Sequence, residues 1–194
     1  MRNAILCFVP VLTLCFASSQ LKAESSSTEP EPEPELRKEA MNIVKIFSDT
    51  LKPKLKEAIQ SGGIEHAIKV CSVEAPKIAY DLSAQTGWSI KRVSLKPRNT
   101  NNARPDTFER NILTKFDLHQ AKSDSSTLLQ YSEIVNNKYR YMKAQAVEGI
   151  CLNCHGSSIS ADAKKTLNQY YPEDLATGYA LGDIRGAFSL VKEL

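Results

Sequence analysis

The chain has 194 residues, which is enough for one domain with a hydrophobic core. Its formal net charge is +3, and it has no Lys/Arg cluster interleaved with aromatic residues, which argues against nucleic-acid binding. The first 35 residues differ in composition from the rest, so we expect a single folded domain over residues 36–194.

Residues 1–23 have the layout of a secretory signal peptide. A positive residue near the N-terminus precedes an apolar stretch, Ala4 to Ala17, that is short for a membrane span, and small residues follow. Cleavage after Ala23 (or Ser19) would export the domain to the periplasm and leave no stable membrane span. An uncleaved membrane anchor is the alternative.

Residues 24–35, "ESSSTEPEPEPE", alternate Glu with Pro. Such a segment cannot bury apolar surface and favours extended polyproline II geometry, so we expect a disordered spacer. Removing the signal peptide takes away one Arg and one Lys and lowers the net charge to +1. Without the five spacer glutamates the domain carries about +6, which favours an anionic partner.

Two helices are predicted at the start of the domain. Leu36–Ser61 and Ile64–Thr86 each carry apolar residues at three- and four-residue steps, and Gly62-Gly63 separates them. Pro53 and Pro76 lie inside these helices and predict a kink or a break in each.

A strand is predicted next, over Trp88–Leu95, which is rich in β-branched and aromatic residues. Its apolar residues change phase after Ile90, which predicts a bulge near Lys91-Arg92 or a polar face turned inward. Lys96–Arg104 has the composition of a loop, and a helix is predicted from Pro105 to Phe116.

The C-terminal half alternates between strands and short helices. Leu128–Val135 and Lys138–Val147 are predicted strands joined by a hairpin turn at Asn136-Asn137. A short helix at Ala161–Tyr170 and a final strand at Ala187–Lys192 complete the chain. Helices that precede an antiparallel sheet, rather than alternating with its strands, predict an α+β fold.

The sequence "CLNCH", Cys151 to His155, is the attachment signal for a c-type haem. Cys151 and Cys154 are spaced to form thioethers with the two vinyl groups of one covalent haem, and His155 would then be an axial ligand of the iron. The predicted export agrees with this, because bacteria attach haem c outside the cytoplasm. Three other interpretations of the motif fit less well. A zinc site would need another close pair of ligands, and a thioredoxin-type redox pair would need a βαβ setting. A disulfide between the two cysteines would close a strained loop.

The second axial ligand has several candidates in the sequence. No methionine follows the motif, unlike in small mitochondrial-type cytochromes. Without the signal peptide three cysteines remain, and the one outside the motif lies on an apolar helix stripe. It is either a ligand or an inert buried thiol. The candidates are Cys71, His66, His119, Met41 and Met142.

Several segments in the same order resemble the c-type haem family with a PAS-like fold, long described as a domain of unknown function. The resemblance extends from about Leu36 to the C-terminus, and it implies a PAS-like antiparallel sheet flanked by N-terminal helices. It further implies His155 and Cys71 as the axial ligands. The segments are "AIKVCSVEAPKIA" (Ala67 to Ala79), "GWSIKRVSLKPRNTNN" (Gly87 to Asn102), "YRYMKAQAV", "CLNCHG" and "DLATGYALGDIRGAFSL" (Asp174 to Leu190).

A cysteine ligand binds iron as the thiolate, whose negative charge favours ferric iron and a low reduction potential. With both faces of the iron filled, no open site remains, so we do not expect an enzyme. The expected function is redox (or gas) sensing through an unidentified redox or signalling protein partner. The alternatives are a periplasmic electron carrier to a respiratory partner and a haem enzyme in which Cys71 is displaced.

The haem propionates need cationic or amide donors where they are partly buried. Arg92, Arg98 and Asn99 are candidate propionate contacts, because they lie in the strand and loop that match the family. Arg92 would otherwise pair with a surface carboxylate. Trp88 and Tyr179 are candidates for the pocket wall, with the hydrophobic core as the alternative place for both.

Overall fold

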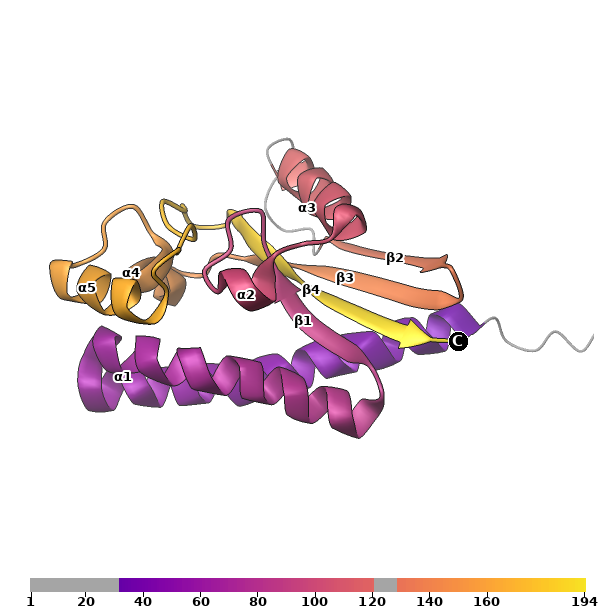
Figure 1. The fold of residues 1–194 in the computed structure, drawn as a ribbon, viewed down its shortest axis with the longest axis horizontal. Helices are drawn as coiled ribbons and strands as arrows, with labels where there is room; N and C mark the ends of the chain where they lie inside the picture. Colours follow the sequence, from indigo (N-terminus) through magenta and orange to yellow (C-terminus); the bar gives the residue numbers. More distant parts are fainter. Residues whose placement is uncertain (1–31, 121–128) are drawn as a thin grey trace, which may run out of the picture. The chain divides into compact units, whose positions relative to one another are not determined.

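The computed structural model describes residues 32–120 and 129–194 (Figure 1). The predicted signal peptide, residues 1–23, lies outside the described residues, and so does most of the predicted spacer. Helix α1 begins at Pro32, so the last four residues of the spacer, 32–35, are helical. The rest of the described chain, up to Leu194, belongs to the same compact unit as α1.

Helix α1 (Pro32–Thr86) is a hairpin of two arms that run side by side in opposite directions (Figure 1). Gly62 and Gly63 leave the helical conformation between the arms, and Gly63 has a φ of +74°, which favours glycine. The break predicted from the glycine pair is therefore confirmed. An ion pair of 2.9 Å between Lys54 and Glu74 links the two arms.

The prediction that Pro53 and Pro76 interrupt the arms is wrong. Both prolines lie inside helical segments, and only the two glycines have non-helical backbone angles. Each proline removes one helical hydrogen bond. The neighbouring side chains of Leu51 and Ala75 are buried in the core, so tertiary packing holds the helix through the proline in each arm.

The sheet has four antiparallel strands in the order β1-β4-β3-β2 (Figure 1). Strand β2 is joined to β3 by Asn136 and Asn137, whose φ angles of 52° and 59° make the predicted two-residue hairpin turn. The bounds are β1 (Ser89–Val93), β2 (Gln130–Val135), β3 (Lys138–Ala146) and β4 (Ile184–Glu193).

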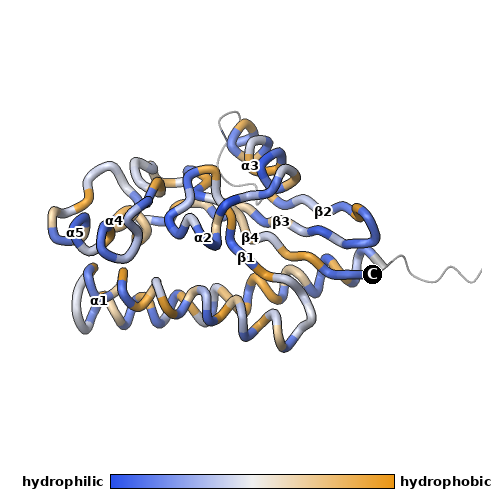
Figure 2. The backbone as a smooth tube through the Cα atoms, in the orientation of Figure 1, coloured by the Kyte–Doolittle hydropathy of each residue, from blue (hydrophilic) through white to orange (hydrophobic). Residues whose placement is uncertain are grey.

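Both faces of the sheet are covered, which explains the change of phase in the first strand. Trp88 and Ile90 face α1, whereas Val93 faces α3 (Thr107–Gln120) on the other side (Figures 1 and 2). β1 pairs with β4 residue by residue from Ser89 to Val93, so neither the predicted bulge nor a polar inner face is needed. The core on the α1 side includes Ala40, Ile43, Phe47, Ala75, Ile78, Leu82, Tyr139, Tyr141, Phe188 and Leu190.

A buried carboxylate, that of Glu109, ties α3 to its face of the sheet. It accepts a hydrogen bond of 2.6 Å from Ser189 and lies 3.0 Å from Lys91 and 3.6 Å from Arg140. It also accepts from the backbone N–H of Asp106, whose side chain accepts in return from the N–H of Glu109. This reciprocal pair caps the start of α3, so the network is structural.

Four short elements remain: α2 (Thr100–Ala103), the 3₁₀ turn η1 (Gly149–Cys151), α4 (Leu152–His155) and α5 (Ala161–Tyr170). Helices α4 and α5 lie beside the end of α1 that holds its turn, whereas α2 lies next to β1 (Figure 1). The hydroxyl of Ser160 caps α5 by accepting from the N–H of Ala163, so the predicted helix has the predicted bounds. Ile64 and Ile68 of α1 pack against α5.

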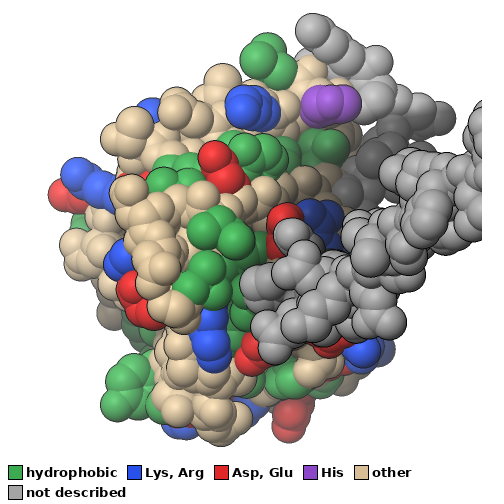
Figure 3. Space-filling model, turned by 90° about the vertical axis from the view of Figure 1, so that its right-hand side faces the viewer, with side chains coloured by type: hydrophobic (Ala, Val, Ile, Leu, Met, Phe, Trp, Pro, Cys, Tyr) green, Lys and Arg blue, Asp and Glu red, His purple; other side chains and the backbone are tan. Residues whose placement is uncertain are grey.

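At the opposite end of the described unit, basic and acidic side chains are interspersed on the surface (Figure 3). None of the helices in the described ranges combines the length and apolarity needed to cross a bilayer. The cysteine motif lies at the other end, beside α1 and α5.

Gly186 of β4 lies against the backbone of β1, and a Cβ atom at this position would be 2.3 Å from the carbonyl oxygen of Val93. We expect Gly186→Ala to lower the free energy of unfolding by about 1–3 kcal/mol, because the strands must move apart. Gly149→Ala is the control, since a Cβ atom there meets nothing within 4 Å. Urea denaturation that shows equal effects for both variants would contradict this account.

Candidate functional site

The cysteine motif forms one helical turn made of η1 and α4. The N–H of Cys151 donates to Glu148 and that of Gly156 donates to Leu152, at 2.9 and 3.0 Å. A side chain at residue 156 would collide with the Leu152 carbonyl oxygen, because a Cβ atom would be 2.7 Å away. The glycine that follows the histidine is therefore required by the turn.

The two motif cysteines are free thiols, and so is Cys71. Cys151 packs against a small cluster around Ala176 and Tyr179, whereas Cys154 packs against the cluster between α1 and α5. Burial raises the pKa of the Cys154 thiol. The side chains of Cys151 and Cys154, although they belong to one helical turn, therefore pack against two different clusters.

A loop after α5 pins this turn in place. The N–H of Gly178 donates to the Gly156 carbonyl and that of Tyr179 to the His155 carbonyl, both at 3.0 Å. The ring of Tyr179 meets the ring of His155 edge-on, with centroids 6.4 Å apart. Tyr179, predicted as part of the pocket wall, therefore lies against the histidine of the motif.

The imidazole of His155 is held by its Nδ1 atom, which lies 2.7 Å from the carbonyl oxygen of Ala176. A carbonyl only accepts, so Nδ1 carries the hydrogen and Nε2 keeps a lone pair. Burial first, and then the charges of Arg185 and Arg98, lower the pKa of His155 to about 2. The ring is therefore neutral at physiological pH, with Nε2 able to act as a ligand.

Arg98, in the loop after β1, is buried and connects the turn to the later loop. Its Nε donates to Asp174 at 3.0 Å, and its Nη2 donates to the carbonyl oxygens of Cys154 and Ala176. Its Nη1 lies 3.3 Å from Nε2 of His155. Arg98 therefore orients the histidine and the loop that binds it.

Arg92 and Arg185 reach the same region from β1 and β4. Arg185 Nε donates to Nε2 of His155 at 3.0 Å. Arg92 lies over the ring of Phe47 on the α1 side of the sheet, with its Cζ 5.2 Å from the ring centroid. Its charge contributes to the lowered pKa values of His155 and Arg185, the latter falling to about 10 mainly through burial. Arg92 is thus close to the cluster around the histidine.

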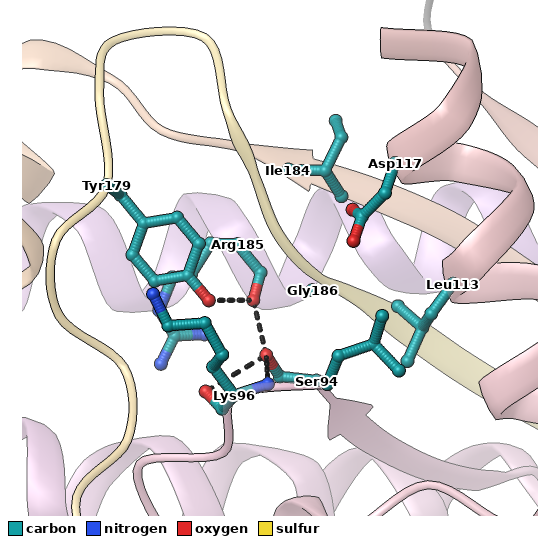
Figure 4. Close-up of a pocket in the computed structure, with 9 residues that line it drawn as sticks. Ser94, Lys96, Leu113, Asp117, Tyr179, Ile184, Arg185 and Gly186 are labelled. Atoms are coloured by element: carbon teal, nitrogen blue, oxygen red, sulfur yellow. Dashed lines mark hydrogen bonds between the residues drawn. The ribbon is translucent and has the colours of Figure 1, made fainter. Parts of the chain in front are cut away.

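The carbonyl of Arg185 forms one side of a small pocket (Figure 4). The hydroxyls of Ser94 and Tyr179 converge on this carbonyl and donate to it at 2.6 and 3.3 Å. Lys96 Nζ lies 4.3 Å from the Tyr179 ring centroid. The pocket, of about 50 Å³, has room for a few water molecules and is too small for a porphyrin. The two hydrogen bonds to the Arg185 carbonyl hold the start of β4 in place and thereby position Arg185.

The structure separates the five candidates for the second axial ligand. Cys71 is partly buried on the second arm of α1, where it packs against the core on that side of the sheet. Met142 is buried on the α3 side of the sheet, away from that arm. The side chains of His66, His119 and Met41 are exposed.

Trp88, predicted in the pocket wall, lies away from His155, and Asn99, predicted as a propionate contact, has a local backbone role. Trp88 is buried in the core beside Tyr139, at the end of β1 that pairs with Val191. Arg185 lies at the other end of β4, so a role for Trp88 in the wall around the histidine does not fit the structure. The carbonyl of Asn99 accepts the first hydrogen bonds of α2.

Three contributors to the site were missed from the sequence: Asp174, the Ala176 carbonyl and Arg185. All three lie in "DLATGYALGDIRGAFSL", one of the segments that resembles the haem family. Their place in that segment is the only feature of the sequence that could have pointed to them. The individual roles follow only from contacts between residues that are far apart in the chain.

A family model matches residues 21–192, and its description is Tll0287-like. The chain belongs to the Tll0287-like family. The family resemblance stated from the motifs is therefore confirmed.

The crystal structure of the cyanobacterial heme-protein Tll0287 is similar in fold. The TM-score is 0.62 and the sequence identity 23%, over 81% of this chain and 94% of that chain. The predicted α+β fold with a PAS-like antiparallel sheet is confirmed by this match and by the sheet described above. No curated protein matches the chain.

Asp174 is the carboxylate that neutralises Arg98, and the two side chains are 7% and 9% exposed. We expect Asp174→Asn to lower the free energy of unfolding by about 3–5 kcal/mol, because it leaves a buried cation unpaired. The neighbouring Glu173→Gln is the matched control. Glu173 pairs with Arg104 at 3.5 Å with both side chains about 70% exposed.

Guanidinium chloride denaturation measures both variants. The control should change stability by no more than about 1 kcal/mol, since exposed ion pairs are weak. A loss for Asp174→Asn as small as that of Glu173→Gln would show that the buried pair does not hold the site together.

Proposed function

We propose that this protein is an exported monohaem c-type cytochrome that acts in redox (or gas) sensing. One haem would be bound covalently by Cys151 and Cys154, with His155 and Cys71 as axial ligands. The observation that carries the proposal is the neutral imidazole of His155, fixed through Nδ1 by Ala176 within a turn that also presents two free thiols.

The residues present fit a haem. An Nδ1–H bound to a carbonyl is the usual way in which proteins orient a metal-binding histidine. The arginines around His155 outnumber the carboxylates, which suits a cofactor with two anionic groups. Membership of the Tll0287-like family supports the same cofactor, since a protein similar in fold is described as a heme-protein.

Cys71 is the candidate for the second ligand that the surroundings favour. It is partly buried on the second arm of α1, which also carries Ile68 of the cluster against which Cys154 packs. The other candidates are exposed or lie across the sheet. A bound haem would supply a one-electron couple of iron. A thiolate from Cys71 would favour the ferric state and lower the potential.

With both axial positions filled by the chain, the site favours sensing or electron transfer over catalysis. The predicted signal peptide supports a periplasmic location, with a redox or signalling protein as partner. Apolar side chains exposed in the motif and in the loop after α5 favour the electron carrier as the second candidate, because a partner protein would cover such groups. They are Ile150, Leu175 and Leu181.

Replacing Cys71 tests the second ligand. We expect Cys71→Met to change the visible spectrum and to raise the reduction potential by on the order of a hundred millivolts, because a neutral thioether replaces a thiolate. Val73→Met is the control, since Val73 is on the same arm and is 60% exposed. Spectra and potentials that match the unaltered protein in both variants would remove Cys71 from the site.

Replacing the motif cysteines tests covalent attachment. We expect Cys151→Ala and Cys154→Ala each to reduce the haem that remains on the chain after denaturing electrophoresis, and the double variant to lose it. Intact-protein mass spectrometry gives the same measurement. Cys71→Ala should retain covalent haem, because a ligand bond does not survive denaturation. Retention by the double variant would contradict thioether attachment.

A further inference from the structure

Two arginine side chains contact the imidazole of His155, and a third lies on the neighbouring strand. Arg185 Nε lies 3.0 Å from Nε2, and Arg98 Nη1 lies 3.3 Å from the same atom. Arg92 lies on the α1 side of β1, and its partner in β4, Phe188, is three residues from Arg185. β1, the loop after it and β4 therefore each bring one positive charge to the same end of the β1–β4 pair.

One of these charges is neutralised by the protein. Arg98 pairs with Asp174, and both are buried. Within the part of the chain that the structure describes, Arg92 and Arg185 form no ion pair, and Arg92 packs over the ring of Phe47. Two partly buried cations without a counter-charge are costly, since burial disfavours an unpaired charge.

We propose that Arg92 and Arg185 bind the two carboxylates of the porphyrin, and that Arg98 instead positions His155. This inference rests on the proposed function. A guanidinium binds a carboxylate through charge-assisted, often bidentate hydrogen bonds, and two carboxylates match the two uncompensated charges. Arg98 is already neutralised by Asp174, and its Nη2 donates to the carbonyl oxygens of Cys154 and Ala176, the second of which holds Nδ1 of His155.

The assignment changes the expectation from the sequence, which had Arg92, Arg98 and Asn99 as the contacts. Asn99 accepts backbone hydrogen bonds at the start of α2, and its side chain makes no capping bond. Arg185 replaces Asn99 in the assignment. Ser94 donates to the backbone carbonyl of Arg185 and so fixes the start of β4, and the side chain of Arg185 reaches the histidine. The sites of the two carboxylates are thus set by the adjacent strands β1 and β4.

The assignment also accounts for an arginine that faces the nitrogen expected to bind iron. Nε2 of a neutral imidazole has one lone pair, which accepts a hydrogen bond or binds a metal ion but not both. A carboxylate is a stronger partner for a guanidinium than a neutral imidazole is. Arg185 therefore exchanges His155 for a carboxylate on binding and leaves Nε2 available.

Haemin and its dimethyl ester separate the carboxylate contacts from the rest of binding, because the ester has the same ring without the two charges. The full chain, produced without haem attachment and kept reduced, is titrated with each. We expect haemin to bind about a hundredfold more tightly than the ester, roughly tenfold for each arginine. Arg92→Gln and Arg185→Gln should each lower this ratio to about tenfold, and Arg92→Lys and Arg185→Lys should preserve most of it.

Two further variants give the controls. Arg98→Gln should weaken haemin and ester equally and leave their ratio unchanged, whereas exposed Arg104→Gln should affect neither. A lowered ratio in Arg98→Gln would overturn its positioning role. Equal binding of haemin and ester by the unaltered chain would overturn this inference while the proposed function stands. Failure to bind either, with no covalent haem in the exported protein, would overturn both.

Discussion

The buried guanidinium of Arg98 is the interaction on which the rest of the site depends. It joins Asp174, the carbonyls of Cys154 and Ala176, and the ring of His155. A charge removed from water is tolerated only when its hydrogen bonds are satisfied. The partners come from two segments, residues 154–155 and 174–176, and the loop that carries Arg98 is the third. The arginine can be buried only when all three segments are in place, and this couples the geometry of the histidine to the folding of the domain.

The two-sided sheet decides which residues can take part. Side chains that alternate along β1 and β4 point to α1 on one face and to α3 on the other. On the α3 face Lys91 and Arg140 are both paired with the carboxylate of Glu109. On the α1 face Arg92 has no such carboxylate and lies towards the cysteine motif. The same strand therefore supplies a closed structural network on one side and an uncompensated cation on the other.

Local patterns in the sequence predicted much of this fold, and contacts between distant residues account for what they missed. Gly62-Gly63 and Asn136-Asn137 act within a few residues, through backbone conformations that other residues rarely adopt, so both turns were predictable. The cysteine motif is likewise local. The pairing of Arg98 with Asp174 spans 76 positions, and no spacing rule connects them. Arg185 lies within the irregular end of β4, between Ile184 and Gly186, where the alternation of faces fails as a guide.

The position of Cys71 bears on the choice between a sensor and a carrier. It lies on the second arm of α1, after the break at Gly63 and before Pro76, where the arm stays helical although the proline has no N–H to donate to the carbonyl of Ser72. Between these points the arm packs on α5, which follows the cysteine motif closely in the chain. A carrier works best when both axial ligands are held rigidly, because little then moves as the electron arrives. If Cys71 binds the iron as proposed, its release would be passed directly to α5, because the arm that carries it packs against that helix, which follows His155 in the chain. This contact is the physical reason for proposing sensing ahead of electron transfer.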